Sequence, residues 1–306
     1  MTDPLDRPDL GIALRVLSGL LFTGMAVCVK ALSEAVPTGQ IVFYRSAFAL
    51  IPLAVFLWWR GELPGGLATR RPGAHLLRSA LGAAAMFASF ATIARLPLAE
   101  AVLIGHLSPI LTAVFAVLIL SERLTVWRIA GVVLGFAGVV ALVWPEFGIG
   151  DPGAATRLTG YALGLLAAAL TAGALLTVRS LARTESPGAI AIYFVAASMV
   201  GGLLTLPSGW AETGRMTFAL LALAGLFGGA AHIAMTLAFR YAEASRLAPF
   251  EYVAFLWAVL ADLVLFGTPL GPSFLLALPL VLLGAASAAS EGAIAAKAAA
   301  RFRSQQ

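Results

Sequence analysis

Two carboxylates interrupt one long apolar run near the C-terminal end of the sequence. Glu251 and Asp262 lie eleven residues apart within residues 245–266. In a helix, eleven residues turn through about 1100°, roughly 20° past three full turns, so both side chains share one face, roughly 16 Å apart along the axis. A carboxylate in such a position can bind an amine or carry a proton. For Glu251, the alternative is a helix-capping or interfacial carboxylate that pairs with Arg246 or Arg240. Asp262 lies closer to the end of the run.

Basic and imidazole side chains form a second group of candidates. Thr23 and Lys30 are seven residues apart and share a helical face, where Lys30 either meets a ligand carboxylate or, as we favour, extends to the membrane surface. Arg45, five residues into its run, receives the same surface interpretation. His106 and His232 lie deeper, where a histidine is either a hydrogen-bonded structural residue or a proton relay. No second His or Cys stands at ligand spacing, so no metal site is expected.

Aromatic, methionine and threonine side chains on several runs can together line an adaptable apolar pocket with polar edges. Met86 and Phe90, for example, share one face of a helix over residues 74–94. The alternative for each of these residues is helix packing or contact with lipid. The candidate binding residues are Thr23, Tyr44, Met86, Phe90, His106, Thr171, His232, Glu251, Tyr252 and Trp257.

The elements that must position these residues are long apolar runs. Of 306 residues, 60% are hydrophobic and 11% are charged, against about 25% charged residues in a typical soluble domain. A transmembrane helix needs roughly 20 apolar residues, so ten helices would use about 200. The runs lie near residues 11–32, 40–59, 74–94, 98–120, 127–145, 158–180, 188–207, 217–239, 245–266 and 271–290. None has the period-2 pattern of a barrel strand, so the sequence predicts an all-α integral membrane protein with ten transmembrane helices.

The sequence lacks residues that several other classes of function require. The single cysteine, Cys28, excludes an internal disulfide framework, and no glycine-rich loop ends in Gly-Lys-Ser/Thr, which argues against ATP-driven work by this chain. An intramembrane enzyme would need a paired catalytic set, but Asp262 is the only aspartate within a run and Lys30 has no serine one turn away on its face. A channel would need a repeated selectivity-filter signature, which we do not find. We expect no enzyme activity and no cofactor.

The distribution of basic residues predicts the orientation. With both termini in the cytoplasm, the inner sections hold fifteen Lys and Arg residues and the outer sections hold four. The formal charge of +5 is then explained by basic residues that face anionic cytoplasmic lipid, so no nucleic-acid partner is expected.

An internal repeat relates the two halves of the sequence. The matched pairs are Gly24/Gly173, Lys30/Arg179 and Tyr44/Tyr193 at a spacing of 149, Gly82/Gly225 and Glu100/Glu243 at a spacing of 143, and Gly138/Gly284. Two repeats, residues 11–145 and 158–290, would each contain five helices. Because five is odd, the second repeat enters the membrane from the opposite side, and a binding site is expected near the shared midplane.

Three stretches carry a resemblance to a known family. They are residues 107–124 (LSPILTAVFAVLILSERL), residues 129–138 (IAGVVLGFAG) and residues 248–258 (APFEYVAFLWA). With the repeat, they resemble the drug/metabolite transporter superfamily, and each half resembles an EamA domain. One departure is Gly267-Thr268-Pro269, where the family pattern has Gly-Glu before Pro.

The resemblance implies two inverted five-helix repeats around a central cavity, in the inner (plasma) membrane of a bacterium. It implies secondary transport of a small metabolite by alternating access, most like the exporters of amino acids, aromatic ones among them. The alternative is an importer of S-adenosylmethionine or another metabolite from the same superfamily. The implied partners are the small-molecule substrate and the lipid bilayer.

Overall fold

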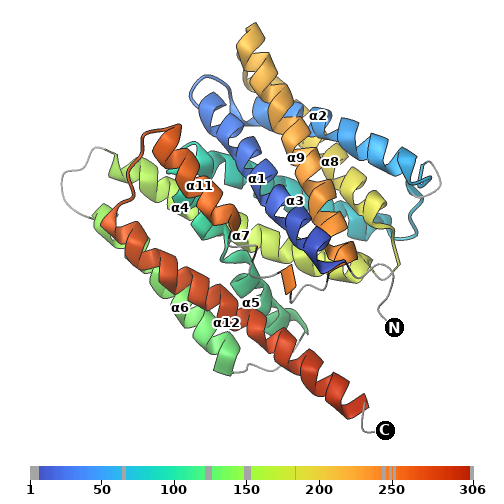
Figure 1. Cartoon of the computed structure of the whole chain (residues 1–306). Helices are drawn as coiled ribbons and strands as arrows, with labels where there is room; N and C mark the ends of the chain where they lie inside the picture. Colours follow the sequence, from blue (N-terminus) through green and yellow to red (C-terminus); the bar gives the residue numbers. More distant parts are fainter. Residues whose placement is uncertain are drawn as a thin grey trace.

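The computed structural model describes residues 7–63, 67–120, 126–147, 153–182, 184–242, 246–247, 250 and 253–303, and over these residues its regular structure is helical, without strands (Figure 1). The prediction of an all-α protein is therefore confirmed. The helices are α1 (Pro8–Leu32), α2 (Thr38–Trp59), α3 (Pro72–Ile93), α4 (Leu98–Gly105), α5 (Ser108–Leu120), α6 (Val126–Val143), α7 (Ala154–Leu181), α8 (Pro187–Leu203), α9 (Arg215–Tyr241), α11 (Val253–Val264) and α12 (Pro272–Arg303), with short 3-10 turns η2 (Trp144–Phe147) and η3 (Leu206–Ser208).

The apolar runs of the sequence become helices of membrane-spanning length. Among the described residues, eight helical segments are long and apolar enough to cross a membrane, and Leu98–Ile119, which contains α4 and α5, counts as one of them. Two shorter apolar helices, Phe255–Val264 and Pro272–Ser287, fall within the last two predicted runs. Each of the ten predicted runs thus contains a helix, and the chain is a multi-span membrane protein.

The span that contains α4 and α5 is interrupted between Gly105 and Ser108. Pro109 has no N–H group, so it cannot donate the helical hydrogen bond to the carbonyl oxygen of Gly105. The Ser108 hydroxyl donates to that oxygen instead, at 2.8 Å. The hydroxyl group thus satisfies the Gly105 carbonyl oxygen inside the bundle. His106 lies at the break between the two helices.

The helix packing has the symmetry of two exchanged halves. Helix α1 packs on α9 as α7 packs on α3, and α2 packs on α9 as α8 packs on α3. The pairs α2–α8 and α6–α12 map onto themselves, and α6 and α12 run side by side at one edge of the bundle (Figure 1). Exchanging α1, α2, α3 and α6 for α7, α8, α9 and α12 therefore preserves these pairings among the described helices.

Glycines that the sequence matched between the halves occupy equivalent crossings. A methyl group on Gly138 of α6 would lie 3.1 Å from the carbonyl oxygen of Ala277 on α12, and one on Gly284 of α12 would lie 2.8 Å from that of Gly131 on α6. Both positions need glycine because the two backbones approach closely.

Candidate functional site

Arg45 lies seven residues into α2 and is the most deeply buried cation of the central region, with 2% of its surface exposed. Its Nε donates to the sulfur of Met25 on α1 at 3.4 Å, and Nη1 has no hydrogen-bond partner among the described residues. A methyl group on Gly228 of α9 would lie 3.0 Å from both Nε and Nη2. The expectation that Arg45 extends to the membrane surface was therefore wrong, because neighbouring helices enclose its guanidinium group.

Arg78 on α3 is a second cation of this region. Its guanidinium carbon lies 4.6 Å from the centre of the Phe194 ring on α8, a cation–π contact. Its Nε and Nη1 are buried without a hydrogen-bond partner in the described part of the chain. The hydroxyl groups of Ser46 and Ser79 are also buried and have no hydrogen-bond partner in the described part of the chain.

His232 lies on α9 close to both arginines. Its ring lies edge-on to the rings of Phe22 and Phe194, with ring centres 5.1 and 6.5 Å apart. The Phe194 ring contacts both His232 and Arg78. Gly228, one turn before His232 on α9, lies against Arg45. Residues from α1, α2, α3, α8 and α9 thus form a polar centre with aromatic walls, which we call the central site and define by Arg45, Arg78 and His232.

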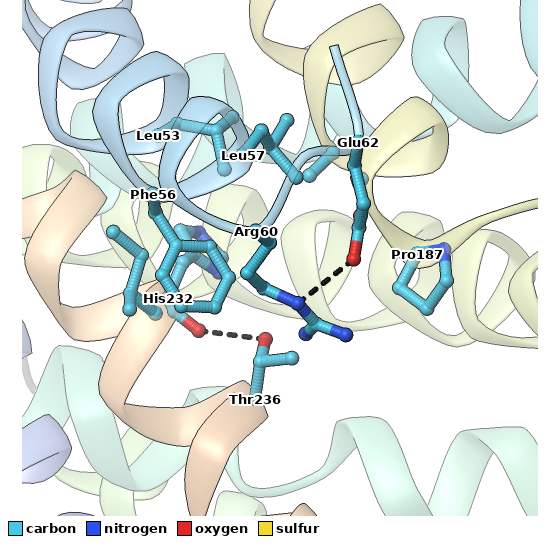
Figure 2. A pocket seen from close by; sticks show the side chains of 11 residues that line it. Leu53, Phe56, Leu57, Arg60, Glu62, Pro187, His232 and Thr236 are labelled. Carbon is cyan, nitrogen blue, oxygen red and sulfur yellow. Dashed lines mark hydrogen bonds and ion pairs between the residues drawn. The ribbon is translucent and has the colours of Figure 1, made fainter. Parts of the chain in front are cut away.

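A cavity of about 120 Å³ leads from the end of α2 toward the central site (Figure 2). Its walls come from α2, α8 and α9, and His232 and Thr236 contribute on the α9 side. At its rim, Arg60 Nε lies 2.8 Å from Glu62 Oε1. The cavity faces the side of the protein where α2 ends and α8 begins, which the sequence predicts to be cytoplasmic.

The other predicted binding residues lie at several places. Met86 and Phe90 are buried in the apolar cluster between the helices. Thr23 is also buried, and its hydroxyl donates to the Gly19 carbonyl oxygen at 3.0 Å. Tyr44 packs among aromatic rings toward the opposite end of α2, including Trp210 at 6.0 Å. His232 is thus the predicted residue that the structure places on the described cavity.

The remaining candidates come from α4, α7 and the region around α11. The Nδ1 atom of His106 lies 2.8 Å from the carbonyl oxygen of Val102, at the break between α4 and α5. Thr171 is half-buried on α7, and the indole N–H of Trp257 is buried without a partner among described residues. Glu251 and Tyr252 lie outside the described residues.

An outer network holds the end of the protein that is predicted to be extracellular. The carboxylate of Asp262 on α11, with 1% exposed, accepts hydrogen bonds from the N–H groups of Leu98 at 3.0 Å and Ala99 at 2.7 Å. Asp262 therefore caps the N-terminus of α4. Lys30 donates to the carbonyl oxygens of Ile93 and Leu96, at 2.9 and 2.6 Å, and caps the end of α3.

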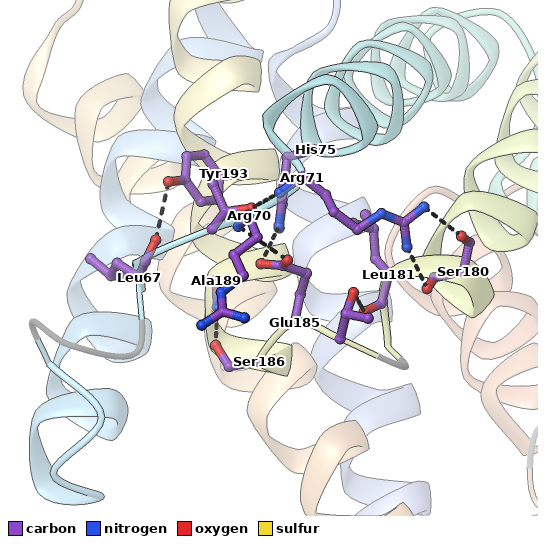
Figure 3. A network of polar contacts seen from close by, with 12 residues as sticks. Leu67, Arg70, Arg71, His75, Ser180, Leu181, Glu185, Ser186, Ala189 and Tyr193 are labelled. Atoms are coloured by element: carbon purple, nitrogen blue, oxygen red, sulfur yellow. Dashed lines mark hydrogen bonds and ion pairs between the residues drawn. The ribbon is translucent and has the colours of Figure 1, made fainter.

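An inner network joins the start of α3 and the residue before it to the end of α7 and the segment between α7 and α8 (Figure 3). Arg71 donates to the carbonyl and hydroxyl oxygens of Ser180, each at 3.0 Å. His75 Nε2 lies 3.3 Å from Glu185 Oε2. Burial raises the pKa of Glu185, but hydrogen bonds from Thr69, His75 and the backbone N–H of Arg70 outweigh it and hold the pKa below its ordinary value.

The fold defines a multi-span membrane protein whose interior holds the buried polar groups of the central site. Residues 9–144 match the EamA-like transporter family. The chain is 32% identical over 260 residues to the pseudopaline exporter CntI of Pseudomonas aeruginosa, covering 81% of this chain and 85% of that protein. It is 30% identical over 265 residues to a riboflavin transporter of Rhizobium johnstonii, covering 85% and 84%. The chain therefore belongs to the EamA-like transporter family, as the resemblance predicted.

More distant similarities agree with this assignment. The chain is 24% identical over 269 residues to an S-adenosylmethionine uptake transporter of Rickettsia bellii, covering 87% of this chain and 88% of that protein. One protein of known crystal structure superimposes with a TM-score of 0.63 at 22% identity, covering 92% of this chain and 97% of the other, which supports the fold. The protein is a small-molecule transporter of the membrane.

Proposed function

We propose that this protein exports amino acids, aromatic ones among them, and related metabolites across the bacterial inner membrane. The observation that carries the proposal is the central site, where polar groups from α2 and α3 of the first half meet His232 of the second half, beside a cavity. A carrier needs such a site between its two halves, because their relative movement then exposes it to one side and then to the other.

The mechanism that we propose is alternating access by two inverted repeats, residues 11–145 and 158–290, with both termini in the cytoplasm. The inner and outer networks lie at opposite ends of the helices, so each can open while the other remains closed. Reporter fusions at the two termini test the orientation, and a pair of fusions that report opposite sides would contradict it.

Counterflow into liposomes tests the substrate class. Liposomes that contain the purified protein and are preloaded with an unlabelled amino acid should take up the labelled amino acid with saturable kinetics. Liposomes without protein should not. If no amino acid is exchanged faster than in liposomes without protein, the assignment of amino acids as substrates is contradicted. The same assay with an imposed pH gradient separates proton exchange from facilitated diffusion.

Direction and coupling residues need separate measurements, because the relatives include both an exporter and an uptake transporter. Cells that carry the gene should tolerate toxic amino-acid analogues better than cells without it, and greater sensitivity would favour import. We further propose that Glu251 binds the substrate amine or a proton. Glu251→Gln should then change the rate or the pH dependence of counterflow, and an unchanged profile would exclude that role.

A further inference from the structure

Arg45 and Arg78 form no ion pair with a described residue, although both guanidinium groups carry buried nitrogen atoms. Nη1 of Arg45 and both Nε and Nη1 of Arg78 lack hydrogen-bond partners in the described part of the chain. A buried cation without a partner is strongly destabilising. An arginine that is 2% exposed and keeps a free donor therefore needs a negatively charged group that is supplied from elsewhere.

The two buried carboxylates among the described residues are both engaged away from the central site. Asp262 accepts two backbone hydrogen bonds in the outer network, and Glu185 belongs to the inner network. The central site therefore has two cations and no described counter-ion. Around them stand the apolar side chains of Met25, Phe22 and Phe194, which contact Arg45, His232 or Arg78.

We infer that Arg45 and Arg78 form an anion-binding site that holds the carboxylate group of the transported substrate, with the apolar part of the substrate beside it. This inference rests on the proposed function, since it treats the central site as the substrate site. Guanidinium groups suit carboxylates because their planar donors bind two oxygens at once. Phe22 and Phe194 would pack against the apolar part of the substrate. A substrate with net positive charge would be repelled by two cations.

A series of probes with one side chain and three charges tests the site directly. N-acetyl-L-phenylalanine is an anion, L-phenylalanine a zwitterion and L-phenylalanine amide a cation. Binding to the purified full-length protein should weaken in that order, with at least about tenfold between the first and the last, as expected for charge-assisted hydrogen bonds. No binding of the anion, or equal binding of all three probes, would overturn the inference.

Variants connect the binding to the two residues. Arg45→Gln and Arg78→Gln should each weaken binding of N-acetyl-L-phenylalanine by about tenfold to a hundredfold, and lysine at either position should restore part of it. Arg215→Gln makes the same change at an exposed position at the start of α9 and should bind as the wild type does. If Arg45→Gln does not fold, the binding measured for Arg78→Gln tests the inference. Unchanged binding in a folded Arg→Gln variant of the central site would overturn the inference.

Counterflow separates this inference from the proposed function. If the anion binds in an arginine-dependent way but no probe or amino acid is exchanged across liposomes, the anion site stands and the transport proposal fails. If exchange is independent of probe charge and survives Arg45→Gln and Arg78→Gln, transport stands and the anion site fails.

Discussion

Asp262 gives the sharpest test of the distinction between a binding residue and a structural residue in this membrane protein. Its buried carboxylate accepts the N–H groups of Leu98 at 3.0 Å and Ala99 at 2.7 Å, which lie at the first turn of α4. A hydrogen bond to a charged group contributes about 1.5–3 kcal/mol, and loss of an N-cap costs about 0.5–2 kcal/mol. Because Asp262→Ala leaves both donors without an acceptor, we expect it to lower the free energy of unfolding by about 3 kcal/mol.

The measurement is the apparent unfolding temperature of purified protein in one fixed detergent. With about 2–4 °C per kcal/mol for chains of 150–250 residues and less for longer chains, Asp262→Ala should lower it by about 5 °C. Asp262→Asn keeps one acceptor oxygen, so it should lower the unfolding temperature by about half as much as Asp262→Ala does. Asp9→Asn, at an exposed acid in the first turn of α1, is the control and should cost a few tenths of a kcal/mol.

Two results would refute the reasoning about Asp262. An unfolding temperature of Asp262→Ala that equals the wild-type value would show that the two hydrogen bonds do not stabilise the protein. Normal stability together with lost counterflow would show that the carboxylate acts on the substrate, and its assignment as a helix cap would then be wrong.

Three further changes test other parts of the structure by the same unfolding assay. Gly284→Ala should destabilise, because its methyl group would lie 2.7 Å from a backbone nitrogen of α6, whereas Gly73→Ala, with no atom within 4 Å, should not. Tyr161→Phe should cost about 1.5–3 kcal/mol, because it removes the hydroxyl that donates to Glu100 at 2.6 Å. The lowered pKa of Glu185 contributes stability above its unfolded value of about 4.3, and this is lost as the pH falls through the lower folded pKa. Below about pH 4 the wild type should therefore lose more stability than Glu185→Gln does.

The sequence predicted the helices well because hydropathy and length are local properties. Residues 98–120 became α4 and α5 within one span, and the matched pair Gly138 and Gly284 meets at the crossing of α6 and α12. The matched glycines could be recognised because close helix crossings need small residues at fixed positions, and such positions leave a trace in a single sequence.

The central site could not be predicted because its residues are brought together by contacts between distant helices. A helix that is apolar on all sides gives no periodic signal, so the sequence of α2 does not indicate whether Arg45 faces lipid, a neighbouring helix or the interior. The partners of Asp262 lie 163 and 164 residues away. The signal that was available was the presence of an ionisable side chain at membrane depth, which held for Arg45 and His232 alike.

The two polar networks differ in a way that bears on the direction of opening. In the outer network, Asp262 is 1% exposed and Lys30 donates at 2.6 and 2.9 Å, so separation would expose buried charges and helix ends. In the inner network, the Arg71 bonds to Ser180 are exposed, so water can replace them at little cost, whereas the His75–Glu185 contact is buried. The cavity beside Arg60 and Glu62 lies at the same end of the protein as the inner network. Opening the end held by the inner network would expose one buried pair, His75 and Glu185, whereas opening the other end would expose Asp262, Lys30 and two helix ends. The first end should therefore open at the lower cost, and in the orientation predicted from the sequence it is the cytoplasmic end.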